Sequence, residues 1–126
     1  RIKAADPEAI IHVHCHGKVN TLLDSFVEMG VDSTDPVEPD DQGDVDFAEV
    51  KQKYDGKMVF RGNIEFLDIE TKQPDELEEI VRICIEEGGK KNMMLKSAAG
   101  PHERPSDLCL ANCERFIEAG ITYGKM

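Results

Sequence analysis

The sequence predicts an α/β fold of four consecutive strand–helix units, which form a single domain over residues 1–126. Two observations lead to this prediction. An apolar strand, a polar loop and an amphipathic helix follow one another four times along the chain. The chain is also long enough to bury one hydrophobic core without covalent cross-links. Strands that alternate with helices pair in parallel through right-handed crossovers, so the loops after the strands share one edge of the sheet.

The first two units differ in the length of their helices. In the first, over about residues 9–30, a helix follows the strand from about residue 19 to residue 29 and Gly30 ends it. In the second, a strand near residues 31–35 precedes a short helix over residues 46–54. The side chains expected to be buried are Leu22, Leu23, Phe26 and Met29 in the first helix, and Phe47, Val50 and Tyr54 in the second.

The third and fourth units contain the strongest helix signals of the chain. A strand at residues 58–60 and a loop over residues 61–64 lead to a helix that begins at Pro74. A strand at residues 93–95 then leads to a helix that is capped by Ser106. The side chains expected to face the core are Leu77, Ile80, Val81, Cys84 and Ile85 in the third helix, and Cys109, Cys113, Phe116 and Ile117 in the fourth.

Charge and composition exclude several classes of protein. The formal net charge of −11 would repel a nucleic-acid backbone or an anionic membrane. No apolar run approaches the roughly 20 residues that a membrane helix needs. We therefore expect a cytoplasmic protein that acts on a small molecule. Its cysteines are expected to be free, with packing or metal-binding roles: Cys15, Cys84, Cys109 and Cys113.

The segment from His12 to Gly17, His-Val-His-Cys-His-Gly, is the most informative motif. It offers three imidazoles and one thiol at the end of a predicted strand, where alternate residues share a face. These are donors that zinc prefers. We therefore expect His14 and His16 to bind a divalent metal ion. The alternative is that these imidazoles are only hydrogen-bonded to backbone carbonyls.

The loops after the other strands carry polar residues that are candidates for substrate binding. In α/β folds this edge of the sheet is where ligands bind. The candidates are Glu38, Arg61, Asn63 and Glu65. Each also has a structural alternative: Glu38 in a solvated loop, Arg61 in an ion pair with Glu38 or Asp35, and Asn63 as a loop-stabilising side chain. No dinucleotide-binding or P-loop motif is present.

Several of these motifs, taken together, resemble the C-terminal half of the uroporphyrinogen decarboxylase family. They are listed in chain order: His14-Cys15-His16-Gly17, Glu28-Met29-Gly30-Val31-Asp32, Asp35-Pro36-Val37-Glu38, Gly62-Asn63-Ile64-Glu65, and a last helix from near Ser106 to Tyr123-Gly124. Members of this family are (β/α)8 TIM barrels, and some are cobalamin-dependent methyltransferases. The resemblance therefore implies that the four units form the C-terminal half of such a barrel. A doubly wound open sheet is the alternative.

The resemblance also implies a set of metal ligands. Zinc-dependent methyltransferases of the family use a His-x-Cys pair after one strand and a second Cys after the last strand. In this sequence His16 stands in place of the first Cys, and the last strand region offers Ser97 instead of the second. We expect His102 to be the third ligand, while Glu38 or Glu65 could supply an oxygen.

The function that the resemblance implies is zinc-dependent methyl transfer between a corrinoid, carried by a partner protein, and a thiol or methoxylated substrate. One alternative is decarboxylation of a tetrapyrrole carboxylate. That reaction needs many cationic groups, and the loops offer only Lys18, Arg61 and Lys96. The other alternative is a non-catalytic half-barrel fragment.

Half a barrel would leave two strand edges unpaired, near residues 10–14 and near residues 93–95. Two copies related by a twofold axis could pair these edges, so we expect a homodimer. We also expect the isolated 126-residue chain to be inactive, because a barrel active site draws on residues from several strands.

Overall fold

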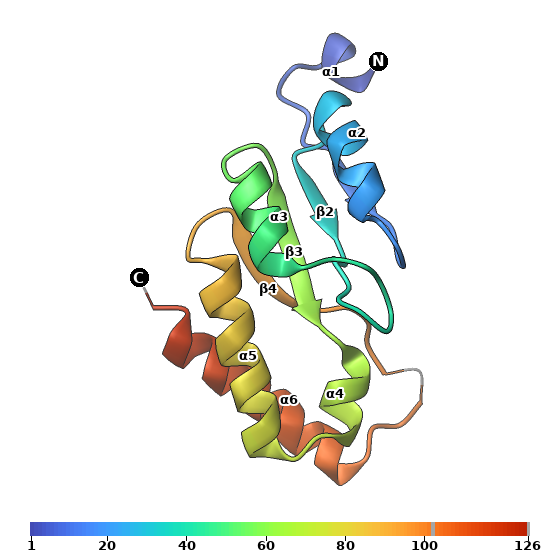
Figure 1. Ribbon diagram of the computed structural model, residues 1–126. Helices are drawn as coiled ribbons and strands as arrows, with labels where there is room; N and C mark the ends of the chain where they lie inside the picture. Colours follow the sequence, from blue (N-terminus) through green and yellow to red (C-terminus); the bar gives the residue numbers. More distant parts are fainter. Residues whose placement is uncertain (102, 126) are drawn as a thin grey trace.

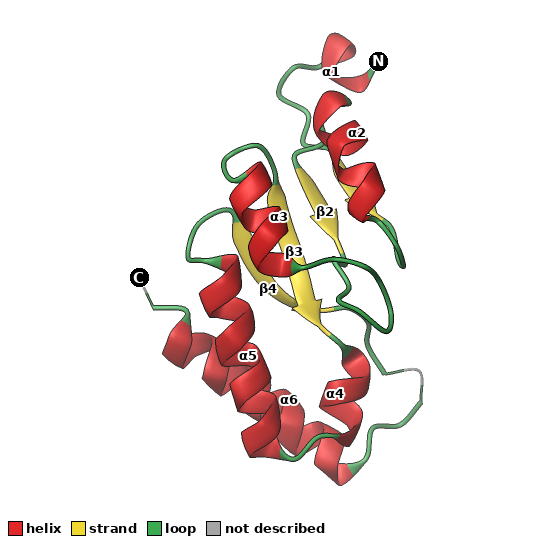
Figure 2. Cartoon of the chain, in the orientation of Figure 1, coloured by secondary structure: helices red, strands yellow, loops and turns green. Residues whose placement is uncertain are grey.

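A computed structural model describes residues 1–101 and 103–125 as a parallel four-stranded sheet with helices between the strands (Figures 1 and 2). The strands lie in the order β1-β2-β3-β4, with all neighbours parallel. Their bounds are His12–His14 for β1, Ser33–Asp35 for β2, Val59–Ile64 for β3 and Met93–Ser97 for β4. The predicted α/β fold of four strand–helix units is therefore confirmed, and the sheet is consistent with half of a barrel.

Helices precede, connect and follow the strands. Their bounds are Ile2–Ala5 for α1, Asn20–Leu22 for the 3-10 helix η1, Leu23–Glu28 for α2, Phe47–Tyr54 for α3, Phe66–Thr71 for α4, Pro74–Gly88 for α5 and Asp107–Tyr123 for α6. Within residues 1–101 and 103–125, none of these helices has the length and the apolar character that crossing a membrane requires.

Helices α3, α5 and α6 pack on the same face of the sheet. The ring of Phe60 on β3 lies 6.4 Å, between centroids, from the ring of Phe47 on α3. Helix α5 ends against β4 at Gly88, where an added Cβ would lie only 2.8 Å from Cγ of Met93. Helix α6 packs against Leu95, which lies on the same face of β4 as Met93. An added Cβ at Gly120 of α6 would lie 2.9 Å from Cδ2 of Leu95. Helices on one face are expected of a half barrel and not of a doubly wound sheet.

The first helical region differs from the prediction. Instead of one helix over residues 19–29, the 3-10 helix η1 is followed by the short helix α2. Leu23 and Phe26 are buried as predicted, but Leu22 is exposed and Met29 is 62% exposed. Leu22 lies in the tighter turn, which rotates its side chain away from the face that an α-helix would give it. Met29 follows the last residue of α2 and is not on its buried face.

Strand β3 extends through the segment that was predicted to be a loop. Residues 61–64 pair in register with residues 94–97 of β4, so both strands are longer than predicted. Helix α4, which follows directly, was not predicted. Six residues give little periodicity in sequence, and their burial depends on contacts with α6.

The other helices confirm the prediction closely. Helix α5 begins at Pro74, and α6 is capped by Ser106, whose hydroxyl accepts a hydrogen bond from the Cys109 amide at 3.1 Å. In α3 the three predicted side chains are buried. In α5 and α6 the buried or half-buried ones are Leu77, Ile80, Val81, Cys84, Ile85, Cys109, Cys113 and Phe116. All four cysteines are free.

Ile117 is the exception among the predicted core residues of α6. It is 59% exposed, because the buried stripe of this helix runs through Cys109, Asn112, Phe116 and Ala119. These residues recur at spacings of three and four, and Ile117 lies about 100° away from Phe116 around the helix.

The side chain of Asn112 joins α6 to the end of α4. It is fully buried, and its amide nitrogen donates to the carbonyls of Ile69 at 2.9 Å and Lys72 at 2.8 Å. Carbonyls at the end of a helix have no partner within the helix, so this amide satisfies two groups that would otherwise be buried and unpaired.

We expect Asn112→Ala to lower the free energy of unfolding by about 1–3 kcal/mol, because two buried carbonyls lose their donors. Urea unfolding followed by circular dichroism measures this change. Glu114→Ala, an exposed substitution on the same helix, is the control. An Asn112→Ala protein as stable as the control would show that water replaces the amide at no cost.

Candidate functional site

The face of the sheet opposite the helices carries a set of polar side chains, which we call the inner face. Strand residues alternate between the two faces. Phe60, Met93 and Leu95 point to the helices, so the residues next to them point away. The inner face comprises His12 and His14 on β1, Asp35 on β2, Arg61 on β3, and Met94 and Lys96 on β4.

Asp35 is the centre of the hydrogen bonds on this face. It is buried, and its Oδ1 accepts from His12 Nε2 at 2.7 Å and from His14 Nδ1 at 2.9 Å. Its Oδ2 accepts from the ammonium group of Lys96. Burial by itself raises the pKa of Asp35, but the hydrogen bonds from Lys96, His14 and His12 outweigh it and hold the pKa well below its usual range. Asp35 is therefore an ionised carboxylate.

Glu38 holds His16 in the same way that Asp35 holds His14. Its Oε1 accepts from His16 Nδ1 at 2.8 Å, and its Oε2 accepts from the Gly17 amide at 2.6 Å. Gly17 has a φ of +84°, a conformation that favours glycine. The carboxylate of Glu38 is buried, whereas the imidazole of His16 is 51% exposed. The loop after β2 thus orients the last imidazole of the motif.

His14 and His16 present the same chemistry. Each donates its Nδ1–H to a buried carboxylate, so in the neutral ring Nε2 carries the free lone pair. The rings meet edge to face with centroids 4.7 Å apart, and the side chain of His14 is 55% exposed. Two imidazoles on one tetrahedral zinc, with Zn–N of about 2.0–2.1 Å, would place their centroids roughly 5 Å apart. The observed separation of the rings is compatible with two ligands of one metal ion.

The structure separates His12 from this pair. Its Nδ1 accepts from the Ser33 hydroxyl at 2.8 Å, and its Nε2 donates to Asp35. Both ring nitrogens are therefore engaged within the protein. Among the described residues, the Nε2 atoms of His14 and His16 have no hydrogen-bond partner, in contrast to the ring nitrogens of His12.

The structure shows no complete set of metal ligands among the residues that it describes. Within residues 1–101 and 103–125, no group of three or more His, Cys, Asp or Glu side chains is arranged to hold a metal ion. The predicted third ligand, His102, lies outside the described residues. The nearby carboxylates of Asp35 and Glu38 bind the imidazoles instead.

Glu65 lies at the end of β3, directly before α4. Burial, together with the negative charges of Glu38 and Asp68, raises its pKa, while His16 lowers it to a smaller extent. Its Oε1 is buried without a hydrogen-bond partner among the described residues. Glu65 therefore belongs to the same electrostatic environment as the His16–Glu38 pair.

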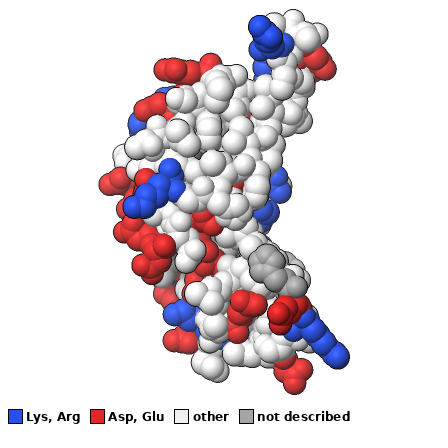
Figure 3. Space-filling view, turned by 90° about the vertical axis from the view of Figure 1, so that its right-hand side faces the viewer, with Lys and Arg blue, Asp and Glu red and all other residues white. Residues whose placement is uncertain are grey.

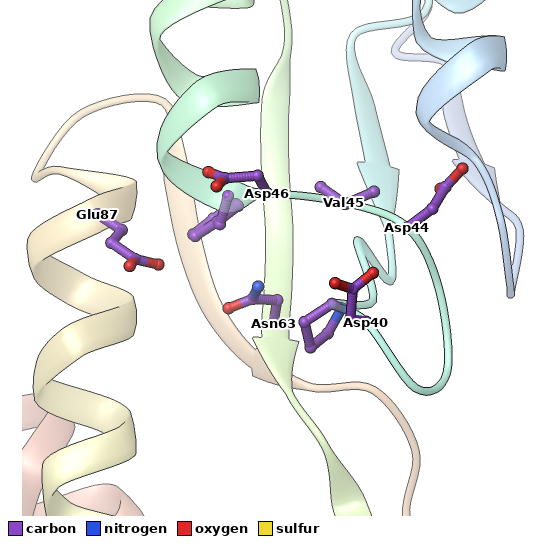
Figure 4. Close-up of a pocket in the computed structure, with 8 residues that line it drawn as sticks. Asp40, Asp44, Val45, Asp46, Asn63 and Glu87 are labelled. Carbon is purple, nitrogen blue, oxygen red and sulfur yellow. The ribbon is translucent and has the colours of Figure 1, made fainter.

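Asn63 lines one cavity with Glu65 and a second one without any other predicted site residue. The second cavity, of about 350 Å³, lies on the side of the helices, with Phe47 at the start of α3 and Glu87 near the end of α5. Figure 4 shows Asn63 between Glu87 and the loop after β2. The other lining residues are Pro39, Asp40, Asp44, Val45 and Asp46. The second cavity is acidic, and His14 and His16 are not among the residues that line it.

Asp35 and Lys96 were missed as site residues in the sequence. Each stands at or near the end of a predicted strand, the position that marked the other candidates. Their role depends on the contact between them, which crosses the intervening strand β3 and leaves no signal in the local sequence. The ion pair of Arg61 with Glu38 or Asp35 is not formed among the described residues.

Comparison with known proteins gives a match in structure only. No protein-family model matches the chain, and no curated protein sequence matches it. Among solved structures, a methyltransferase from Methanosarcina mazei has a TM-score of 0.70 and 18% sequence identity, covering 97% of this chain and 34% of that chain. This chain therefore spans about a third of the length of that protein. At this identity the similarity shows a shared fold, and membership of the uroporphyrinogen decarboxylase family stays a prediction.

We expect Asp35→Asn to lower the free energy of unfolding at pH 7 by about 1.5–3 kcal/mol, because the amide cannot accept from two imidazoles and an ammonium group as a carboxylate does. Chemical denaturation at one fixed protein concentration measures this change. Asp24→Asn, at an exposed aspartate paired with Lys53, is the matched control and should change stability much less. Equal effects at the two positions would contradict the central role of Asp35.

Proposed function

We propose that this chain contributes the metal-binding part of a methyl-transfer enzyme, with His14 and His16 as two zinc ligands. One observation carries the proposal: the adjacent imidazoles are both oriented by buried carboxylates, and neither Nε2 has a hydrogen-bond partner within residues 1–101 and 103–125. A histidine ligand of zinc commonly donates its other ring N–H to a carboxylate. The fold shared with a methyltransferase supports the type of reaction.

The residues of the chain would prepare the ligands. Asp35 and Glu38 fix the orientation of the rings, and Lys96 favours the ionised form of Asp35. Zinc, when bound, would hold a thiol as its thiolate or polarise the oxygen of a methoxylated substrate. His102 is the proposed third ligand. The methyl group would pass between this substrate and a corrinoid on a partner protein.

Decarboxylation of a tetrapyrrole carboxylate has less support. A substrate with many carboxylates needs several free cations. On the inner face the cations are Arg61 and Lys96, and Lys96 is paired with Asp35. Zinc binding separates methyl transfer from this alternative and from a non-catalytic fragment.

We expect the EDTA-treated and dialysed protein to bind zinc at pH 7, and His14→Ala and His16→Ala each to weaken binding strongly because a ligand is lost. Glu38→Gln should weaken it by about 10–100-fold through the orientation of His16. Competition with a chromophoric chelator measures these affinities. His102→Ala tests the proposed third ligand in the same assay.

His12→Gln is the matched control for these variants. It removes an imidazole from the same strand, but one whose nitrogens are both engaged by the protein. The control should keep most of the zinc affinity. Unchanged zinc affinity in the double variant His14→Ala/His16→Ala would contradict the proposal.

The homodimer also stays a prediction, and the outer strands of the sheet suggest how to test it. Strands β1 and β4 are the outer strands of the sheet. The exposed Ile10 lies shortly before β1, and the exposed Ile121 lies on α6, the helix that follows β4. Light scattering at micromolar concentration should give twice the chain mass of 14.1 kDa. Ile10→Lys and Ile121→Lys should each shift the protein towards monomer. Leu67→Lys, at an exposed leucine on α4, is the control.

A well-folded monomer in the wild-type protein would contradict this prediction. An equal loss of dimer in Leu67→Lys would show that association is non-specific.

A further inference from the structure

Arg61 is a cation without an acidic partner on the inner face. Its Nε is buried and has no hydrogen-bond partner among the described residues. No Asp or Glu within residues 1–101 and 103–125 lies in ion-pair distance of its guanidinium group. A buried donor that stays unsatisfied is costly, and in a chain of net charge −11 an arginine without a carboxylate is unexpected.

The contact that Arg61 does make cannot satisfy it. Its Nη1 lies 3.4 Å from Nε2 of His12. That nitrogen donates its proton to Asp35, because an ionised carboxylate can only accept a hydrogen bond. Two donors therefore face each other, and no hydrogen bond results.

Asp35 is not available to Arg61 either. Its Oδ1 already accepts from two imidazoles, and its Oδ2 accepts from Lys96. The positive charge of Lys96 compensates the negative charge of Asp35, so the positive charge of Arg61 has no counter-charge among the side chains of the inner face. The inner face thus carries a net positive charge, although the chain as a whole is acidic.

The surface view agrees with this separation of charge. In Figure 3 the carboxylates gather towards the left, the side of α3 and α5, and basic atoms mark the right-hand border at mid-height. Apolar surface lies beside Arg61 as well. Met94 pairs with it in register on the neighbouring strand and is 54% exposed.

We infer that Arg61 binds the carboxylate of a small organic molecule whose apolar part lies on Met94. A guanidinium group forms two parallel hydrogen bonds with a carboxylate. The Nη groups of Arg61, which have no carboxylate partner among the described residues, would donate them, because Nε is buried. The inference rests on the proposed function in one respect, because it takes the bound acid to be the substrate of methyl transfer. It narrows that substrate to a methylated or methoxylated carboxylic acid.

Binding is tested without metal, in EDTA-treated protein, with 4-methoxybenzoate as the probe and the neutral 4-methoxybenzamide as its comparison. Titrations followed by ¹H–¹⁵N NMR should show the benzoate moving the Arg61 Nε–Hε signal. The benzamide should bind about tenfold more weakly or worse, because it lacks the charge. A variant is not needed for this comparison, so it holds even if a substitution unfolds the protein.

Arg61→Gln should lower the affinity for 4-methoxybenzoate by about tenfold or more, and Arg61→Lys should retain part of it. Arg82→Gln is the matched control, because this arginine lies on α5 and is paired with Glu79 and Glu86. Equal affinity of Arg61→Gln and wild type, or equal affinity of the two probes, would overturn the inference. Because no metal is present, failure of the zinc site would leave this result unchanged, and failure here would leave the zinc site standing.

Discussion

The buried carboxylate of Asp35 is the interaction on which the inner face depends. It stands on β2, and it accepts from side chains of β1 on one side and from Lys96 of β4 on the other. Three positively polarised groups offset the cost of burying one negative charge. The result is a fixed orientation for His14, whose exposed nitrogen would otherwise turn freely about its side-chain bonds. Glu38 repeats this arrangement for His16 with the help of the Gly17 amide.

The order of strands makes these contacts unavoidable. Parallel neighbours end at the same edge of a sheet, so the loop after β1 must meet the loop after β2. The end of β1 and the loop after it carry imidazoles, and the end of β2 and the loop after it carry carboxylates. Basic rings therefore lie against acidic groups as a consequence of topology. These polar groups can be partly buried because the imidazoles and the carboxylates satisfy each other's hydrogen bonds.

The sequence predicts the fold well wherever the signal is local. Pro74 and Ser106 mark the starts of α5 and α6, and the spacing of apolar residues identifies their buried faces. The ends of β3 and β4 are different, because polar residues there are held by pairing between the strands. The site shows the same difference between features set by the local sequence and features set by contacts between distant residues. His14 and His16 could be proposed from their spacing, but the engagement of His12 depends on Ser33, which is distant in sequence.

The separation of charge on the molecule limits how an anion could be recognised. A chain of net charge −11 repels anions at long range, and salt screens charges beyond about 8–10 Å. Recognition must then come from direct contact with a group whose own charge is uncompensated. Lys96 does not meet this condition, because Asp35 neutralises it, whereas Arg61 does. Affinity at such a site would depend on the geometry of the guanidinium group, which favours a planar carboxylate over a spherical ion. The acidic helices and the basic inner face would together select a small organic acid against polyanions such as nucleic acids, which would also meet the repulsion of the rest of the surface.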